Sequence, residues 1–379
     1  MHLTRLALTD FRSYESVDVK LGPGVTTFTG SNGQGKTNLV EAACYVATFA
    51  SHRVATDAPL VRQGADRAIL RAAIRSAGRD SLVEIEINAG RANRVRLNRS
   101  PVSRPREVLG VLRCVLFAPE DLTVVKGDPD QRRRYLDDLL VASRPRYAGV
   151  RADYERVLRQ RTALLRSAKA QGGVPPSAME VWDDHLVAMG AELTAARLRL
   201  IAGIQPLVAR SYSAVSGTER DTTMRYRMSA LRQADAGLET DLELDADPAK
   251  IAGLLREALA ARRRAELERA VCLVGPHRDE LELQVGGLPS RGYASHGESW
   301  SLALALRLAA YQLLRAGGED PVLILDDVFA ELDSDRRDRL ADLVGDAEQV
   351  LVTAAVPADV PAGLSGTRYT VAKGVISDG

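Results

Sequence analysis

Residues 29–42 read TGSNGQGKTNLVEA and contain the pattern Gly-x-x-x-x-Gly-Lys-Thr, which begins at Gly30 and ends at Thr37. The preceding residues VTTFT predict a strand over 25–29, and the following residues predict a helix over 36–48. Glycines between a strand and a helix let the backbone wrap around a phosphate, and the helix N-terminus adds positive potential. The stretch therefore predicts an α/β fold with a nucleotide-binding loop.

The residues of this loop have separate expected roles. Lys36 is expected to bridge the β- and γ-phosphates of ATP and to act in catalysis, and Thr37 is expected to bind Mg²⁺. Only six of the 51 basic residues are lysines, which adds weight to a lysine at this position. The alternative is a glycine-rich turn that matches by chance. The predicted nucleotide-binding residues are Gly30, Ser31, Asn32, Gly33, Gln34, Gly35, Lys36, Thr37 and Asn38.

Two carboxylates follow an apolar run at 322–325. A continuous apolar run of this length is typical of a buried parallel strand, and ligands gather at the carboxyl ends of such strands. We therefore predict that Asp326 binds Mg²⁺ and that Asp327 orients or deprotonates the attacking water. The alternative is that both carboxylates cap a helix after a core strand.

A third polar cluster opens the apolar stretch YASHGESWSLALALRL at 293–308. Its small or polar residues are Ser295, Gly297, Glu298 and Ser299. Small residues let a helix N-terminus close on a phosphate, and a hydroxyl can donate to a phosphate oxygen. The alternative is an ordinary helix N-cap in which Glu298 complements the helix dipole.

The rest of the chain suggests two structural parts. Residues 3–9, 69–74, 82–87, 94–97 and 111–119 read as strands, whereas 130–268 are rich in Arg, Ala, Leu and Glu at helical spacing, with a break at 171–177. Strands and helices alternate again after residue 270. We predict an α/β domain with a mixed sheet, built from 1–125 and 271–379, and an all-helical insertion over 126–270.

Composition narrows the class of protein. No apolar run approaches the length that spans a bilayer, and the N-terminus has no signal-peptide pattern, so we expect a cytoplasmic protein. Cys44, Cys114 and Cys272 fit neither a disulfide framework nor a zinc site.

Charge is distributed unevenly along the chain. Residues 1–210 hold 32 basic and 22 acidic residues, and residues 211–379 hold 19 basic and 28 acidic residues. The basic part suggests a polyanion partner, although arginine richness can equally reflect a GC-rich genome.

Two arginine clusters are candidate DNA contacts. Residues 91–113 carry seven arginines and one acid, and 131–134 read QRRR. Arginine contacts to phosphates give salt-dependent binding without sequence preference. The alternative for each cluster is a solvated basic face. The candidate residues are Arg91, Arg94, Arg96, Arg132, Arg133 and Arg134.

The phosphate loop, the polar cluster at 295–299 and the carboxylate strand together resemble the ATP-binding-cassette (ABC) superfamily. The resemblance implies that Ser295, Gly297, Glu298 and Ser299 form the signature motif, which contacts the γ-phosphate of ATP bound to the opposite subunit. It also implies that AELD at 330–333 forms a turn between the two active sites and that Thr353 senses the γ-phosphate.

A narrower resemblance is to the bacterial RecF family, carried by LTDFRSYES, GSNGQGKTNLVEA, VLFAPEDLTVVKGDPDQRRRYLD, GPHRDEL and VLILDDVFAELD, in that order. It implies a weak, DNA-stimulated ATPase that acts in recombinational gap repair and replication-fork maintenance, and in the SOS response. ATP and Mg²⁺ would drive head-to-tail homodimerisation on DNA at single-strand/double-strand junctions, and slow hydrolysis would release the dimer. Together with RecR and RecO, the protein would assist RecA loading, and it would be associated with the nucleoid.

Two features depart from the family pattern. The signature reads Ser-His-Gly-Glu-Ser where relatives often have Ser-Gly-Gln-Gln, and the glutamine loop has no clear position, with 118–122 as its expected place. Three alternatives stay open at this point. They are an SMC-like protein, a transporter-type ABC ATPase, and a scaffold that binds ATP without significant turnover, which Asp327 in place of a glutamate would suit.

Overall fold

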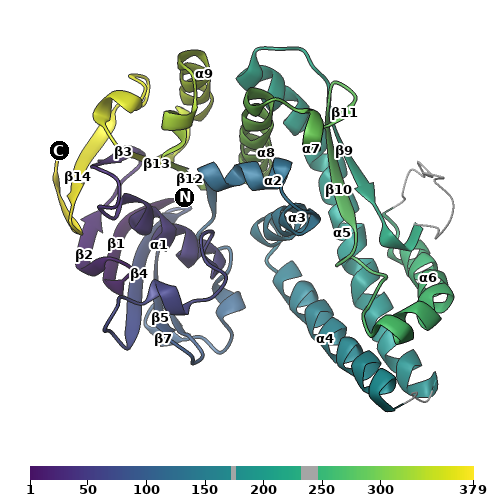
Figure 1. The fold of residues 1–379 in the computed structure, drawn as a ribbon. Coiled ribbons are helices and arrows are strands. Elements are labelled where there is room, and N and C mark those ends of the chain that lie inside the picture. The colour runs from purple at the N-terminus through teal and green to yellow at the C-terminus, as the bar shows by residue number, and fades with distance from the viewer. Residues whose placement is uncertain (172–175, 232–245) are drawn as a thin grey trace. The chain divides into compact units, whose positions relative to one another are not determined.

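The computed structural model describes residues 1–171, 176–231 and 246–379 (Figure 1). These residues form two compact units. The first unit contains 1–122, 210–219 and 300–379, and the second contains 123–209 and 220–299. The predicted domain boundaries stay a prediction. They differ from the two units mainly at 271–299, which lie in the second unit.

One six-stranded sheet of the first unit is antiparallel, in the order β2-β1-β4-β5-β6-β7. Buried and exposed side chains alternate along its strands, so that one face packs on the core and the other face carries charge. On the charged face, Arg71 lies opposite Glu84, which also lies opposite Arg96. The strands are β1 (His2–Phe11), β2 (Tyr14–Lys20), β4 (Arg67–Ser76), β5 (Arg79–Asn88), β6 (Arg94–Leu97) and β7 (Ser100–Pro101).

The other six-stranded sheet has the order β15-β14-β3-β13-β12-β8 and is parallel except for the β14–β15 hairpin. All five residues of β12 and all six of β13 are buried, as expected for strands covered on both faces. The predicted strand over 111–119 is shorter in the structure, where β8 covers Cys114–Phe117. The other strands are β3 (Gly24–Thr29), β12 (Val322–Asp326), β13 (Gln349–Ala354), β14 (Gly366–Ala372) and β15 (Val375–Asp378).

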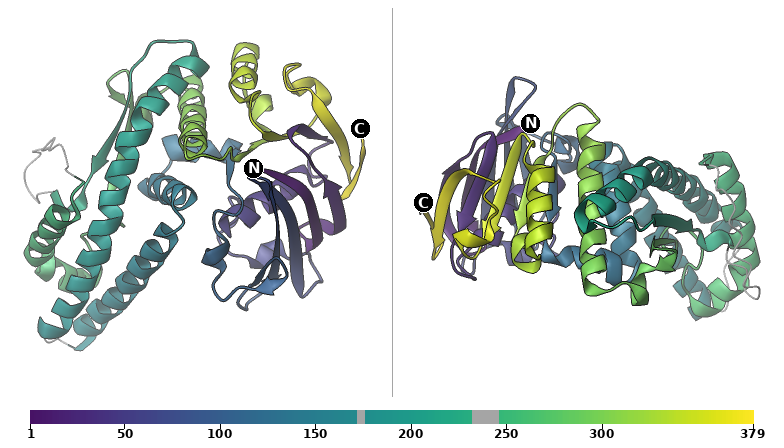
Figure 2. Two further views of the ribbon diagram at one scale, coloured as in Figure 1. Left: turned by 180° about the vertical axis from the view of Figure 1, so that it is seen from behind. Right: turned by 90° about the horizontal axis from the view of Figure 1, so that it is seen from above.

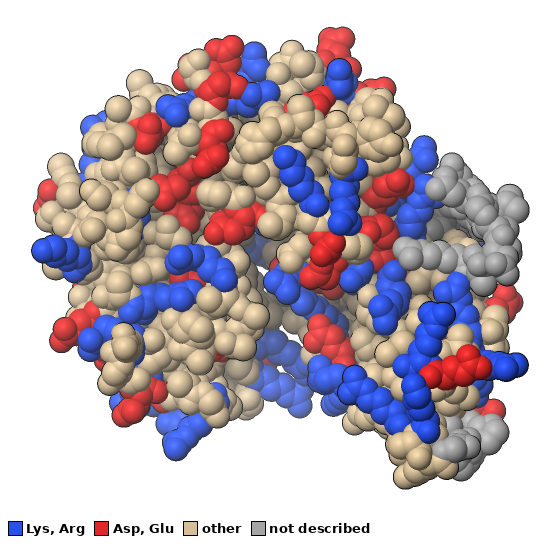
Figure 3. All heavy atoms as spheres, in the orientation of Figure 1, with Lys and Arg blue, Asp and Glu red and all other residues tan. Residues whose placement is uncertain are grey.

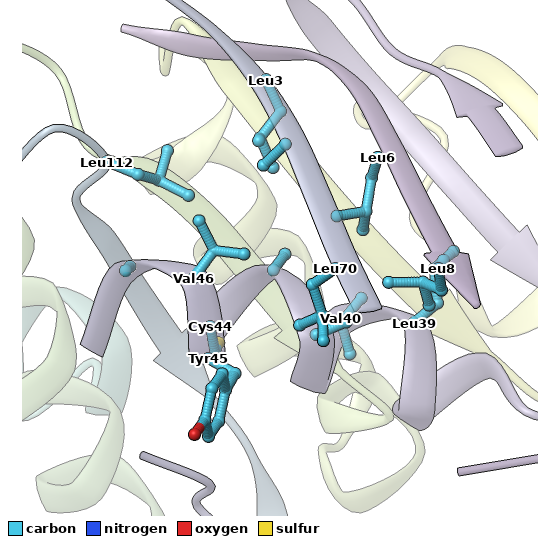
Figure 4. Close-up of a cluster of buried hydrophobic side chains, with 14 of the residues drawn as sticks. Leu3, Leu6, Leu8, Leu39, Val40, Cys44, Tyr45, Val46, Leu70 and Leu112 are labelled. Carbon is cyan, nitrogen blue, oxygen red and sulfur yellow. The ribbon is translucent and has the colours of Figure 1, made fainter. Parts of the chain in front are cut away.

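Helix α1 (Lys36–Thr48) contacts strands of both sheets and forms the centre of the first unit's core. Leu39, Val40 and Val46 of α1 pack with Leu6 of β1 and Leu70 of β4, all at most 2% exposed (Figure 4). This burial fixes the direction of α1 and therefore the position of the loop that precedes it. Three other long helices contribute to this unit: α8 (His296–Arg315) from residue 300, α9 (Ser334–Val344), and the C-terminal end of α5 (Pro176–Ser216) from residue 210.

The second unit consists mainly of helices, which run beside one another in Figure 2. The helices are α2 (Leu122–Lys126), α3 (Pro129–Ser143), α4 (Tyr147–Gln171), α5 (Pro176–Ser216), α6 (Pro248–Arg269) and α7 (Ser290–Tyr293). Of the predicted break at 171–177, residues 172–175 lie outside the described residues.

The fold prediction is confirmed with one correction, because the insertion is not entirely helical. Strand β9 (Thr222–Arg227) pairs with β10 (Glu280–Val285), which pairs with β11 (Leu288–Pro289).

Several arginines of the second unit are buried in ion pairs. Arg161 is fully buried and donates to Asp183 at 2.7 Å and to Glu266 at 2.6 Å. Arg197 is 2% exposed and makes a bidentate pair with Asp137 at 2.8 and 2.9 Å. Loss of one partner from such a pair would leave an uncompensated buried charge, which is strongly destabilising. Within the described ranges, no helix is long and apolar enough to span a bilayer.

Candidate nucleotide site

The loop at 30–35 is held in its shape by contacts that require glycine. A Cβ atom on Gly30 would lie 2.2 Å from the carbonyl oxygen of Val371. Gly35 has a φ of 114°, and a Cβ atom there would lie 3.0 Å from the hydroxyl oxygen of Tyr14. Because side chains are excluded at these positions, the backbone N–H groups of the loop can approach a ligand closely.

Lys36 lies at the N-terminus of α1 and is 3% exposed. Its ammonium group donates to the carbonyl oxygens of Gly30 at 2.7 Å and Ser31 at 3.3 Å. The positive charge is therefore held over the loop, where the β- and γ-phosphates of a nucleotide are expected to bind.

Three polar residues from distant parts of the chain meet at the carboxyl ends of the parallel strands. The Oδ1 atom of Asp326 accepts a hydrogen bond from Thr37 at 3.1 Å and another from Thr353 at 2.6 Å. The sheet register explains the second contact, because Asp326 lies opposite Thr353 across β12 and β13. The structure thus brings the two predicted metal ligands together with the predicted γ-phosphate sensor.

The oxygen atoms of Thr37 and Asp326 suit Mg²⁺. This ion prefers oxygen ligands, keeps several bound waters, and is usually held by one or two carboxylates together with the phosphates of the substrate. Thr37 supplies a hydroxyl and Asp326 a carboxylate. Asp326 is only 3% exposed, and burial raises the pKa of its carboxyl from 3.8 to about 6. Burial disfavours the negative charge of this carboxylate, and a bound cation would stabilise that charge. The site therefore fits a divalent ion.

Asp327 follows the end of β12 and has a left-handed backbone with a φ of 50°. Its backbone N–H donates to the hydroxyl oxygen of Thr353 at 3.0 Å. A non-glycine residue in this conformation is uncommon and marks a position that the surrounding structure imposes. The side chain of Asp327 is half-buried, next to the candidate metal ligand Asp326.

The predicted signature motif forms the start of α8. The Ser295 hydroxyl accepts from the Glu298 N–H at 3.3 Å, and the Glu298 carboxylate accepts from the Ser295 N–H at 2.9 Å. This reciprocal pair is a capping box. These bonds from Ser295, followed by the charge of Arg220, lower the pKa of Glu298. Ser299 is buried and donates to the Ser295 carbonyl at 2.8 Å, while Gly297 is half-buried.

The remaining sequence motifs have structural contacts of their own. Asp333, the last residue of AELD, caps α9 by accepting from the Arg336 N–H at 2.9 Å. Asp121, in the expected position of the glutamine loop, is 7% exposed and accepts from Arg307 at 2.9 Å. Neither contact tests the roles that the ABC resemblance implies for these segments.

The candidate DNA-binding arginines do not share one environment. Arg91, Arg94 and Arg96 are exposed, and Arg94 is 80% exposed with a loose pair to Glu86 at 3.8 Å. Arg132 is 5% exposed and forms a bidentate pair with Glu280 at 2.8 and 3.1 Å. This environment gives Arg132 a structural role and leaves its guanidinium unavailable to DNA.

The neighbours of Arg132 differ from it in exposure. Arg133 is half-buried, donates to the Asp279 carbonyl at 2.8 Å, and has its pKa lowered by burial. Arg134 is exposed. Figure 3 shows further basic side chains gathered over α4 and α6 of the second unit. The exposed basic residues of α4 include Arg159, Arg166 and Lys169.

Sequence reasoning did not single out Ser13, Arg53 or Lys373, which contact the predicted loop residues Asn38 and Gln34. Asn38 donates to the Ser13 hydroxyl at 2.9 Å and accepts from Arg53 at 3.0 Å. The backbone N–H of Lys373 donates to the Gln34 side chain at 2.7 Å. Ser13 lies within LTDFRSYES, a stretch that the sequence singled out only as a resemblance. Neither Arg53 nor Lys373 belongs to a motif, and Lys373 is 339 residues from Gln34.

Comparisons with known proteins cover almost the whole chain. Residues 2–362 match the RecF/RecN/SMC N terminal domain family. The chain is 59% identical over 380 residues to the DNA replication and repair protein RecF of Frankia alni, and 57% identical over 384 residues to that of Streptomyces avermitilis, with 99% of each chain covered. A solved structure of the recombination mediator protein RecF with ATP in the RecFOR pathway superposes with a TM-score of 0.89 at 26% identity, covering 99% of this chain and 97% of the other. An SMC head domain shares the fold, with a TM-score of 0.58 at 17% identity.

Proposed function

This chain belongs to the RecF family, and we propose that it is an ATP-dependent DNA-binding protein that dimerises around two composite nucleotide sites. RecF proteins are DNA replication and repair proteins, so the transporter-type and SMC-like alternatives are set aside. The observation that carries the proposal is the 3.1 Å hydrogen bond between Thr37 and Asp326. It joins the phosphate loop to a carboxylate 289 residues away, in the arrangement that a Mg²⁺–nucleotide complex needs.

Each residue of the site then has a role in nucleotide binding. The loop N–H groups and Lys36 bind the phosphates, and the hydroxyl of Thr37 and the carboxylate of Asp326 hold Mg²⁺. Bound Mg²⁺ neutralises charge on the β- and γ-phosphates. Asp327 orients the attacking water, and Thr353 holds both Asp326 and the backbone of Asp327 in place.

The signature motif completes the site of a second copy of the chain. In this proposal the N-terminus of α8, with Ser295 and the small residue Gly297, closes on the γ-phosphate bound by the other subunit. Two copies arranged head to tail bury two nucleotides, so ATP stabilises the dimer and hydrolysis releases it. The side chain of Asp327 is shorter than that of a glutamate, which fits slow ATP hydrolysis. DNA is expected to increase the rate of this hydrolysis.

DNA is the proposed polyanion partner. Exposed arginines on the antiparallel sheet and basic side chains on α4 provide contacts to the phosphate backbone, which give salt-dependent binding without sequence preference. We propose single-strand/double-strand junctions as the binding sites and RecA loading with RecO and RecR as the pathway. A DNA partner also implies a cytoplasmic, nucleoid-associated location. The candidate contacts are Arg91, Arg94, Arg96, Arg134, Arg159, Arg166 and Lys169.

Gel filtration with light scattering tests the proposal. The chain is run with and without ATP and Mg²⁺, then with gapped DNA at two salt concentrations, beside a Lys36→Met variant. The expected result is an ATP-dependent dimer, retained on gapped DNA at low salt, that the variant does not form. A chain that stays monomeric with saturating ATP, or a variant that dimerises as the wild type does, would contradict the proposal.

A further inference from the structure

Two turns from distant parts of the chain meet at the phosphate loop. The first joins β1 to β2 and leads into Tyr14, and the second joins β14 to β15 through Lys373 and Gly374. Strand β14 lies beside β3, the strand that enters the loop (Figure 1). Lys373 and Gly374 have φ values of 48° and 75°, as expected for a two-residue hairpin turn whose central residues are both left-handed. The loop and both turns belong to the first unit, so their contacts lie within one compact body.

The two turns contact backbone carbonyl groups at the C-terminal end of the loop. The Gly374 N–H donates to the carbonyl oxygen of Gln34 at 3.2 Å. The Tyr14 hydroxyl donates to the carbonyl oxygen of Gly35 at 3.0 Å. A trans peptide unit is planar, and its C=O and N–H groups point in opposite directions. Holding these two carbonyls on the outside of the loop therefore turns the N–H groups of Gly35 and Lys36 to the inside, where a phosphate is expected to bind.

Both donors are themselves held in place. Tyr14 is fully buried, and burial raises the pKa of its hydroxyl to about 12, so the hydroxyl keeps its proton at neutral pH. A Cβ atom on Gly374 would lie 3.2 Å from the carbonyl oxygen of Ser13, so the β14–β15 turn also packs against the β1–β2 turn. The Lys373 N–H adds a bond of 2.7 Å to the side chain of Gln34. The two turns and the loop are thus one connected group of backbone contacts.

We propose that Tyr14 and the β14–β15 turn are positioning elements of the nucleotide site. They hold the phosphate loop, before nucleotide binds, in the conformation that presents its N–H groups to the phosphates. Both act through Gln34 and Gly35 rather than by touching the nucleotide. A loop that is already ordered does not lose conformational freedom when the ligand binds, so this arrangement strengthens nucleotide binding. The inference rests on the proposed nucleotide-binding function.

A turn elsewhere in the same unit provides a matched control for Gly374→Ala. In the β4–β5 turn, Ala77 and Gly78 have φ values of 46° and 75°, so Gly78→Ala places the same strain on a hairpin of the same kind. The antiparallel pairing of His2 with Arg75 puts this turn at the opposite end of the sheet from the β1–β2 turn. Its nucleotide affinity should therefore respond only if strain in any hairpin is enough.

A second tyrosine provides the control for Tyr14→Phe. The hydroxyl of Tyr369, on β14, donates to the carbonyl oxygen of Lys20 at 3.0 Å. Tyr369→Phe therefore removes a hydroxyl with the same kind of bond from the same hairpin, where the acceptor is on β2 instead of the loop. Comparing the two variants separates support of the loop from support of the fold.

Affinity for ADP with Mg²⁺ is measured by isothermal titration calorimetry, and folding stability is measured separately by urea titration without nucleotide. ADP is used because dimerisation in the proposed function needs ATP, so ADP binding reports on a single chain. Tyr14→Phe and Gly374→Ala are each expected to weaken ADP binding about fivefold, the change that the net contribution of one hydrogen bond gives. Tyr369→Phe and Gly78→Ala are expected to leave ADP affinity unchanged, although Gly78→Ala lowers folding stability.

Each result decides for or against the positioning role. If each variant binds ADP as tightly as its control, the two turns support only the fold and the inference is overturned. If Gly374→Ala does not fold, the comparison of Tyr14→Phe with Tyr369→Phe decides alone. A wild-type chain that does not bind ADP or ATP would overturn the proposed function together with the inference, so the two failures are distinguishable.

Discussion

Replacing Asp326 with asparagine is expected to stabilise the nucleotide-free protein while destroying its activity. The carboxyl is 3% exposed, and burial raises its pKa from 3.8 to about 6. The folded chain therefore keeps a proton that the unfolded chain releases above pH 3.8. Folding stability contributed by this group is fully present below pH 3.8, falls as the pH rises to 6, and is lost above it.

The size of the effect follows from the same pKa. A rise from 3.8 to about 6 corresponds to about 3 kcal/mol at pH 8 and about 1 kcal/mol at pH 4.5. Asparagine avoids this cost because it carries no charge. Its oxygen can still accept from Thr37 and Thr353, since both hydroxyls donate to the same Asp326 oxygen. At about 2–4 °C per kcal/mol, the variant should unfold about 6–12 °C higher at pH 8.

Thermal unfolding followed by circular dichroism measures this difference without nucleotide or Mg²⁺. Asp342→Asn, which neutralises an exposed carboxylate on α9, serves as the control and should unfold as the wild type does. Asp326→Asn should also lose Mg²⁺-dependent ATP hydrolysis, an exchange of stability for function that is common at active sites. A variant no more stable than the wild type at pH 8, or an advantage that does not change with pH, would refute the reasoning.

Three further changes separate catalysis, DNA contact and structural support. Asp327→Asn should leave ATP binding intact, slow hydrolysis and prolong the ATP-bound dimer; an unchanged hydrolysis rate would remove Asp327 from the mechanism. Arg94→Ala with Arg96→Ala should weaken DNA binding and reduce its salt slope by about one per arginine, so an unchanged slope would place DNA elsewhere. Arg132→Ala leaves the half-buried Glu280 without its partner and should lower the free energy of unfolding by about 1.5–3 kcal/mol, measured by urea titration.

The local motifs could be predicted from the sequence because each is a short stretch with its own physical requirement. The phosphate loop needs glycines followed by Lys36 and Thr37, and the apolar run before Asp326 is typical of a buried parallel strand. Both patterns are local, so they predicted the strand–loop–helix unit and the carboxylate strand. The parallel sheet then brings them together at one edge, as the contact between Thr37 and Asp326 shows.

Features that depend on distant pairing could not be predicted in this way. Strand β9 becomes a strand by pairing with β10, more than 50 residues away, and its own residues TTMRYR alternate too briefly to stand out within a helical stretch. Counting charges treats Arg132 and Arg134 alike, although one is buried in an ion pair and the other is exposed. The contact of Lys373 with Gln34 depends on the β14–β15 turn, which sequence spacing does not place beside the loop.

Mixing two inactive variants tests most directly whether two copies share each nucleotide site. Lys36→Met keeps its signature motif and loses its phosphate cradle, whereas Ser295→Arg keeps its cradle and loses its signature. Each variant alone should stay monomeric with ATP, and Ser295→Arg should still bind nucleotide. Their mixture should form ATP-dependent heterodimers with one intact site, detected by light scattering and by restored hydrolysis. A mixture as inactive as its components would contradict a site built from two chains.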